Sequence, residues 1–223
     1  YSDNRFSTAF EEFTAAFYPD HPYGVPIIGY PDHLKYPSMS KMHEYFETYY
    51  VANNMALVLS GNFNSSEINP LIEQKFGQWR SRKMPVTQDF WKIEPFKGRE
   101  FVEKKLTPIK FGIRAYRSVP QNSDEVPVLD VIGALMSNGS QTGLLDELVI
   151  ENKLTTAQMF ADRRTEAGGE YLFFVPKVVG QSLAKAEQLI EAKLNDLKAG
   201  NFDESLLEAI KTEIIVNYQR NFE

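Results

Sequence analysis

The sequence predicts an α+β fold, in which a mostly antiparallel sheet carries helices layered on one face and is preceded by a helical lead-in. Three observations lead to this class. Strand-like runs recur between helical patterns from Met55 onward. Two of these runs are separated by Ala167-Gly168-Gly169, a sequence that favours a hairpin turn. The helical patterns come in pairs, not one between every two strands, which indicates helices stacked on an antiparallel sheet.

The lead-in consists of two expected helices joined by a loop. Residues 5–17 form an amphipathic pattern rich in Phe and Ala. Residues 18–31 are rich in Pro and Gly, which are excluded from helix interiors and central strands. A second helix is expected from Met39 to Tyr50, with Ser38 or Ser40 as its N-cap.

The next two elements are a buried strand and a helix. Residues 55–60 (MALVLS) form a continuous apolar run that ends at Gly61, which is typical of a buried strand. A helical pattern follows from Asn64 to Trp79. It contains Pro70, which a helix tolerates best in its first turn, so the helix is expected to start near Glu67.

Residues 80–98 are polar and contain two prolines, so they are expected to connect two parts of the fold. Two strands are expected after them, at 100–106 and 109–118. In the second strand apolar and polar side chains alternate, which predicts one buried and one exposed face.

The remaining elements form the C-terminal part of the predicted sheet and its helices. Capping residues mark several of their ends, since Ser and Asp favour helix starts and Gly favours helix ends. The expected helices are 123–136, 143–152, 182–200 and one after Asp203, and the expected strands are 156–163 and 170–176.

Composition excludes several classes of function. The chain has 223 residues, no Cys, 43% hydrophobic and 24% charged residues, which is typical of a globular protein. The formal net charge is −6, and the nearest basic cluster is Arg80, Arg82 and Lys83 in a short polar stretch. Nucleic-acid binding needs a larger basic surface. No apolar run approaches the ~20 residues of a membrane helix. The sequence therefore indicates neither a nucleic acid nor a membrane as a partner.

The sequence contains no recognisable catalytic or metal-binding motif. His43 and Glu47 lie one helical turn apart, a spacing that can hold a metal, but no third ligand is near in the sequence, so an exposed surface pair is expected. His21 and His33 lie in loops. No H-x-x-E-H or H-E-x-x-H motif, phosphate loop or nucleophile elbow occurs. The sequence predicts no catalytic residue and no metal ligand in this chain, and it identifies no substrate-binding residue.

The order of certain residues is more informative than their types. His21-Pro22-Tyr23-Gly24 is followed by Ile28-Gly29, by Phe46 and Tyr49-Tyr50, and by the stretch Asn53 to Phe63. This ordered string resembles the pitrilysin/insulinase family of zinc peptidases, in which a similar string leads into the second αβ subdomain of a half-molecule. The helix that ends in Phe76-Gly77-Gln78-Trp79 is similar to that family's next helix, and the resemblance extends more weakly to the last helix.

Two departures from the family pattern carry information. The family's inactive half supplies an Arg–Tyr pair from the segment that resembles Ser140 to Thr156, where this chain has Val149 and Thr156. The family's zinc motif and its downstream Glu precede the His21 loop, and by spacing that Glu falls before Tyr1. The resemblance therefore implies the second subdomain of the zinc-bearing half. Residues 1–50 would be a lead-in and loop from the preceding subdomain, and 51–223 a metallopeptidase-like subdomain with the connector 80–98.

The resemblance implies a fragment of a zinc-dependent endopeptidase that contributes a non-catalytic subdomain to a clamshell peptide chamber. The zinc would belong to the parent protein and not to this chain. The implied partners are the preceding zinc-binding subdomain, a second family half and a peptide substrate. The alternative is a fragment of a catalytically inactive scaffold or partner subunit of the same family. A third hypothesis, an unrelated binding domain, rests on the acidic balance and the missing chemistry. The compartment is left open between periplasm and cytoplasm, with the periplasm favoured.

Overall fold

The computed structural model describes residues 5–85, 93, 95–96, 98–105 and 107–220. By its packing the chain divides into two compact units. One consists of residues 1–17 together with 93–223, and the other of residues 18–92. This division by contacts differs from the predicted boundary between residues 50 and 51, which refers to family subdomains and stays a prediction.

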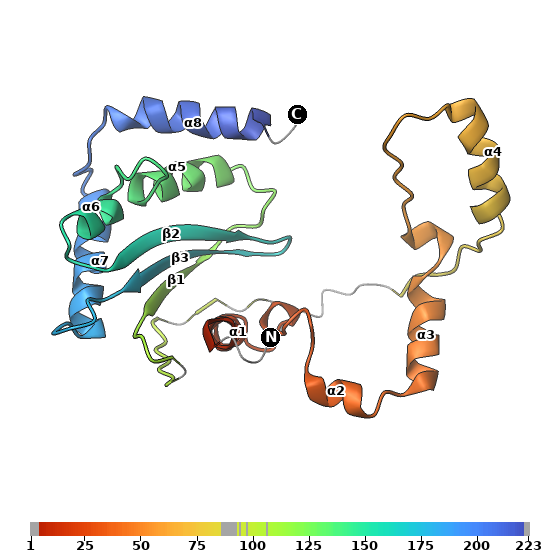
Figure 1. Ribbon diagram of the computed structural model, residues 1–223, viewed down its shortest axis with the longest axis horizontal. Coiled ribbons are helices and arrows are strands. Elements are labelled where there is room, and N and C mark those ends of the chain that lie inside the picture. The colour runs from red at the N-terminus through yellow and green to blue at the C-terminus, as the bar shows by residue number, and fades with distance from the viewer. Residues whose placement is uncertain (1–4, 86–92, 94, 97, 106, 221–223) are drawn as a thin grey trace. The chain divides into compact units, whose positions relative to one another are not determined.

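The larger unit is built on a three-stranded antiparallel sheet (Figure 1). Its strands are β1 (Gly112–Ser118), β2 (Thr156–Arg163) and β3 (Gly168–Val175), in the spatial order β1-β3-β2. Leu172 of β3 lies opposite Met159 of β2 and Arg114 of β1. The α+β class with an antiparallel sheet and a helical N-terminal region is confirmed.

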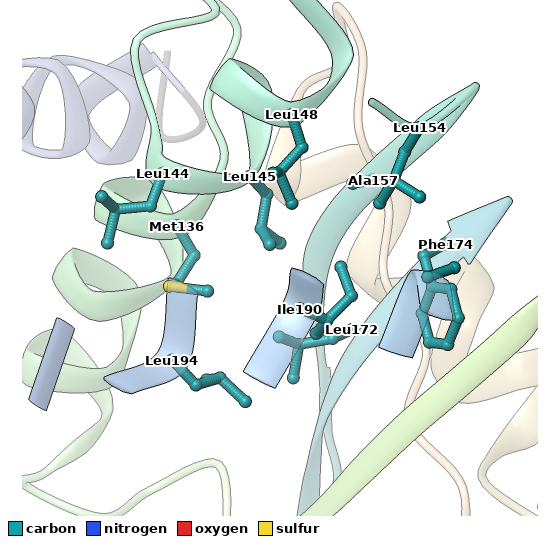
Figure 2. Packing of buried hydrophobic residues seen from close by; sticks show 11 residues of the cluster. Met136, Leu144, Leu145, Leu148, Leu154, Ala157, Leu172, Phe174, Ile190 and Leu194 are labelled. Atoms are coloured by element: carbon teal, nitrogen blue, oxygen red, sulfur yellow. The ribbon is translucent and has the colours of Figure 1, made fainter. Parts of the chain in front are cut away.

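Three helices cover one face of this sheet: α5 (Val126–Met136), α6 (Leu144–Ile150) and α7 (Leu183–Lys198). Leu172 and Phe174 of β3 point into this layer, where Leu145 and Ile190 are fully buried (Figure 2). Burying a side chain of this size stabilises the fold by about 1.5–3 kcal/mol, so this cluster is the main core. Its members are Met136, Leu144, Leu145, Leu148, Leu154, Ala157, Leu172, Phe174, Ala186, Ile190 and Leu194.

The opposite face of the sheet is covered by α1 (Arg5–Phe17). Successive residues of a strand point to opposite faces, so Tyr171 and Phe173 face away from the main core. The Tyr171 ring lies edge-on to Phe13 and Phe17, with ring centroids 5.1 and 5.3 Å apart, and the Phe6 ring lies 5.8 Å from Phe173. The aromatic stripe of the lead-in helix is therefore a second core.

The last helix, α8 (Leu206–Arg220), packs on α5. Ile210 anchors it and is 4% exposed. Asp203 accepts a hydrogen bond from the Ser205 backbone N–H at 2.9 Å just before the helix begins. Ser182 caps α7 by accepting the Lys185 N–H at 3.2 Å, as the sequence predicted.

The unit of residues 18–92 contains α2 (Pro31–Lys35), α3 (Met39–Tyr49) and α4 (Ser65–Phe76) with the 3₁₀ turns Pro22–Gly24 and Ala52–Asn54. Ser38, one of the two predicted candidates, caps α3. Asn53 holds the segment after α4 by exchanging two hydrogen bonds with the backbone of Arg82, at 2.9 and 3.1 Å. Few of its apolar side chains are buried, Tyr18 and Val51 among them, and many are exposed.

Two predicted strands are wrong for the described residues. Residues 55–60 form no strand, and Leu57 and Val58 are 53% and 86% exposed. Residues 100–105 also form no strand, and Leu106 lies outside the described residues. An apolar run becomes a strand only where a neighbouring strand pairs with its backbone. Neither segment has such a neighbour within the ranges the structure describes.

Three smaller expectations are also corrected. Helix α4 starts at Ser65 and not near Glu67, because Asn64 accepts the Ser66 N–H at 3.0 Å and caps the helix. The turn between β2 and β3 is the segment 164–167, since Gly168 and Gly169 already pair within β3. Pro31, expected in a loop, is the first residue of the short helix α2, because proline fits the first turn of a helix.

The described parts of connector 80–98 contain no helix or strand; residues 86–92, 94 and 97 lie outside them. Within the described residues, no helix has the length and apolar character needed to cross a membrane.

Candidate functional site

A cavity of about 290 Å³ opens where α5, β2 and α8 meet. Its apolar lining comes from all three elements and includes Leu129, Met159, Ile210 and Ile214. Its charged lining consists of Asp130, Arg163, Glu170 and Glu213. The combination of an apolar wall with a few converging charges is typical of a ligand site.

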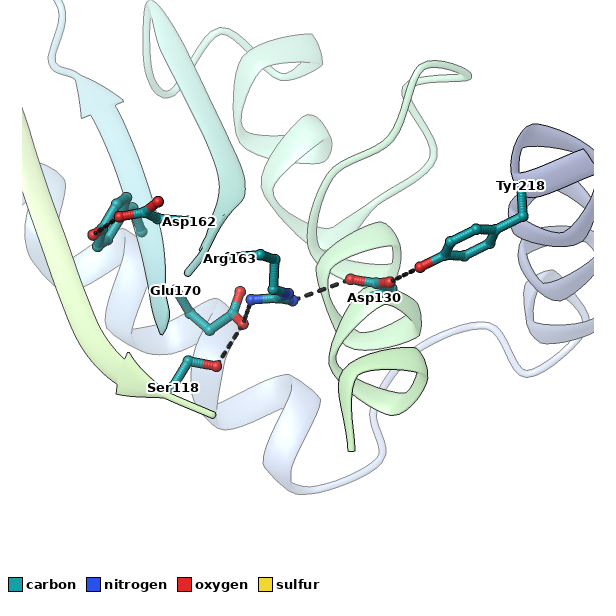
Figure 3. A network of polar contacts seen from close by, with 7 residues as sticks. Ser118, Asp130, Asp162, Arg163, Glu170 and Tyr218 are labelled. Atoms are coloured by element: carbon teal, nitrogen blue, oxygen red, sulfur yellow. Dashed lines mark hydrogen bonds and ion pairs between the residues drawn. The ribbon is translucent and has the colours of Figure 1, made fainter. Parts of the chain in front are cut away.

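One arginine organises the polar side of this cavity (Figure 3). Arg163, at the end of β2, pairs with Glu170 of β3 and donates to Asp130 of α5 at 3.1 Å. The Ser118 hydroxyl donates to Glu170 at 2.9 Å, and the Tyr218 hydroxyl of α8 donates to Asp130 at 2.9 Å. This network ties β1, β2, β3, α5 and α8 together.

The network keeps its charges because they are paired. Burial by itself lowers the pKa of Arg163, but the hydrogen bonds that it donates to Glu170 and Asp130, together with their charges, outweigh burial and raise this pKa. Glu170 is only 6% exposed, so its carboxylate depends on Arg163 and Ser118 for compensation. The hydrogen bond to Asp130 raises the pKa of Tyr218. Arg163 therefore stays cationic and Tyr218 neutral near pH 7.

Along the outer edge of β2, the backbone groups of Met159 are hydrogen-bonded, whereas those of Ala161 have no partner among the described residues. The Ser137 hydroxyl accepts the Met159 backbone N–H at 2.7 Å and donates to the Met159 carbonyl at 3.3 Å. In an antiparallel pair, alternate residues turn both backbone groups away from the neighbouring strand. Met159 turns its backbone groups away from β3, so Ala161 and Arg163, which follow at every second position, turn theirs away as well. Ala161 is exposed and lines the cavity, and its outward N–H and C=O meet no partner among the described residues.

Within the part of the chain that the structure describes, the histidines form no metal site. His43 Nδ1 and Glu47 Oε1 lie 3.6 Å apart, with side chains 77% and 51% exposed. His21 is buried, and its Nδ1 accepts the Tyr23 N–H at 3.1 Å. The His33 ring lies edge-on to Tyr30. No group of three or more potential ligands occurs in the described ranges, so these residues do not provide the ligand set of a zinc site.

The structure places Val149 near the end of α6, 37% exposed, and Thr156 at the start of β2. The network residues Asp130, Arg163, Glu170 and Tyr218 were not predicted from the sequence as site residues. The Arg163–Glu170 pair had a local signal, because the two residues flank the hairpin on the same face of the sheet. Asp130 and Tyr218 are 88 positions apart, and nothing in the sequence connects them.

Comparison with known proteins identifies the family to which the chain belongs. The family profile described as "Peptidase M16 inactive domain" matches residues 38–214. A curated zinc protease of Mycobacterium leprae (strain TN), itself uncharacterized, is 29% identical over 65 residues, which is 29% of this chain and 15% of that protein.

Solved structures resemble the chain over almost its whole length. A protease from Helicobacter pylori superposes with a TM-score of 0.74 at 16% identity and covers 99% of this chain. The periplasmic protease PqqL from Escherichia coli superposes with a TM-score of 0.72 at 15% identity and covers 97%. The chain spans 59% of the first protein and 24% of the second, so it matches a part of each.

Proposed function

Because the chain belongs to the M16 peptidase family, through a match to its inactive domain, we propose that it is the non-catalytic part of a zinc-dependent endopeptidase and forms part of the wall of a peptide-binding chamber. The zinc and the catalytic residues lie elsewhere in the parent protein. A second family half, on the same or another chain, closes the chamber. The chain itself binds no zinc and cleaves no peptide.

The open edge of β2 beside the cavity carries the peptide-binding part of this proposal. An extended peptide adds to a sheet through main-chain hydrogen bonds, while pockets select alternate side chains. Ala161 offers an outward N–H and C=O, and the cavity lies next to it on the α5 side of the sheet. The Ser137 hydroxyl occupies the same groups of Met159, so an added strand pairs from Ala161 toward Arg163.

Two substitutions at one position test this edge. In Ala161→Pro the ring removes only the outward N–H, and edge strands tolerate proline with that orientation. Ala161→Val keeps the N–H and serves as the matched control. Binding of a short fluorescein-labelled peptide of alternating Thr and Val to the 223-residue chain, measured by anisotropy, should be lost in the proline variant and kept in the valine variant. Equal binding by both variants would remove the edge from the proposal.

Alternate N-methylation of the same peptide gives an independent control. A strand that adds to β2 points every second N–H toward Ala161 and the rest away. Methylation in one register should abolish binding, and in the other register should leave it intact. Equal loss in both registers would indicate an association that does not use strand pairing.

The competing function is a catalytically inactive scaffold or partner subunit of the same family. The match to the inactive domain supports neither choice, because this chain contains no zinc motif. The whole protein decides between them. Peptide hydrolysis that a chelator abolishes and zinc restores supports the endopeptidase, whereas peptide binding without hydrolysis in the presence of zinc supports the scaffold.

A further inference from the structure

We infer that the cavity beside β2 selects a lysine or arginine side chain of the bound peptide, with Glu213 of α8 as the residue that determines this preference. The inference rests on the proposed binding of an extended peptide at the β2 edge. It adds the class of side chain that enters the cavity and the residue that recognises it.

The charge of the cavity is unbalanced. Three carboxylates and one guanidinium line it within the described residues: Asp130, Glu170, Glu213 and Arg163. Arg163 is already shared between Glu170 and Asp130, and Asp130 also accepts the Tyr218 hydroxyl. The side chain of Glu213 forms no ion pair or hydrogen bond with any residue in the described ranges. The lining therefore has a formal charge of −2 and one carboxylate ready to accept a cation.

The position of Glu213 fits a side chain that comes from the β2 edge. Side chains of an added strand alternate between the two faces of the sheet, so those level with Ala161 and Arg163 point toward α5 and α8. Ile210 and Ile214, which flank Glu213 on α8, supply apolar surface in the same cavity. The methylene stem of a lysine or arginine packs on such surface while its charged end reaches a carboxylate. A glutamate of the peptide would instead meet a lining with a formal charge of −2.

Three peptides that differ at one position test the inference. The position that enters the cavity holds Lys, Gln or Glu in an otherwise identical Thr/Val peptide. The 223-residue chain should bind the Lys peptide about fivefold more tightly than the Gln peptide, and the Glu peptide most weakly, as expected for a partly exposed ion pair. The Lys preference should shrink at high salt, since salt screens exposed charges.

Substitutions on α8 assign the preference to one residue. Glu213→Lys should reverse the order of the three peptides, while Glu208→Lys on the same helix, which does not line the cavity, should leave it unchanged. If the Gln and Lys peptides bind equally, or if Glu213→Lys does not alter the order, the charge preference is wrong although peptide binding stands. If none of the three peptides binds, the proposed peptide edge fails and the preference fails with it.

Discussion

Replacing Arg163 by methionine should destabilise the larger unit by about 3 kcal/mol. The change leaves the carboxylate of Glu170, whose side chain is 9% exposed, with only the Ser118 hydroxyl as a partner. Removing one member of a buried ion pair costs about 3–5 kcal/mol, and the lower end applies because the Arg163 side chain is 19% exposed. Asp130 retains the Tyr218 hydroxyl and is itself 26% exposed, so it adds little.

The chain offers a matched control in Arg114, whose side chain is also 19% exposed. Its partner Glu191 is 42% exposed, so water compensates that carboxylate when Arg114 is removed. Arg114→Met should therefore cost about 1 kcal/mol or less. The double variant Arg163→Met with Glu170→Met should recover most of the stability, because an apolar pair avoids the unpaired buried charge.

Hydrogen exchange of the β3 amides measures this difference, supported by urea unfolding followed by far-UV circular dichroism. Tryptophan fluorescence is unsuitable, since Trp79 belongs to the other unit, residues 18–92. A loss of about 3 kcal/mol corresponds to exchange on the order of 100-fold faster. Equal losses in Arg163→Met and Arg114→Met, or no recovery in the double variant, would refute the reasoning from buried charge.

Three further predictions follow from the fold and the site. Zinc titration of the isolated chain against a chelating indicator should show no site of micromolar affinity, and a quenched-peptide assay no hydrolysis; chelator-sensitive cleavage would place catalytic residues in this chain. Leu145→Ala should cost about 3 kcal/mol because Leu145 is fully buried, whereas Leu34→Ala, at a side chain 77% exposed, should leave the urea midpoint unchanged. The hydrogen bond to Asp130 raises the pKa of Tyr218 above its unfolded value, so its contribution to stability is complete below about pH 10 and is lost as the pH rises through the folded pKa. Tyr218→Phe should lack this alkaline loss in urea unfolding, and an unchanged pH profile would exclude Tyr218 as its source.

Local chemistry made the elements of the larger unit predictable. Ser182 and Gly200 predicted the two ends of α7, and the strand-like run before the Ala167-Gly168-Gly169 turn predicted β2, because caps and turns act within a few residues. The predictions were wrong where the structure of a segment depends on a strand that is distant in the sequence. Residues 55–60 have the composition of a buried strand, yet Val58 is 86% exposed, since composition does not state what the strand would pair with.

The candidate site was less predictable than the fold. Its network joins Ser118, Asp130, Arg163, Glu170 and Tyr218, which come from five elements. Only tertiary packing brings them together, and each of these residue types is common on solvated surfaces. The sequence also gave no sign of the open edge, because the orientation of the Ala161 backbone follows from the pairing register with β3.

The hydroxyl of Ser137 has a consequence for how the chain behaves at high concentration. An exposed strand edge is a template on which further copies of a chain can stack. By occupying both backbone groups of Met159, this hydroxyl shortens the free edge of β2 to the stretch around Ala161 and Arg163. A stretch that short admits a single short segment and gives poor support to a growing fibril. The Ser137 hydroxyl thus leaves enough of the edge free for a peptide while reducing the length on which other copies of the chain could stack.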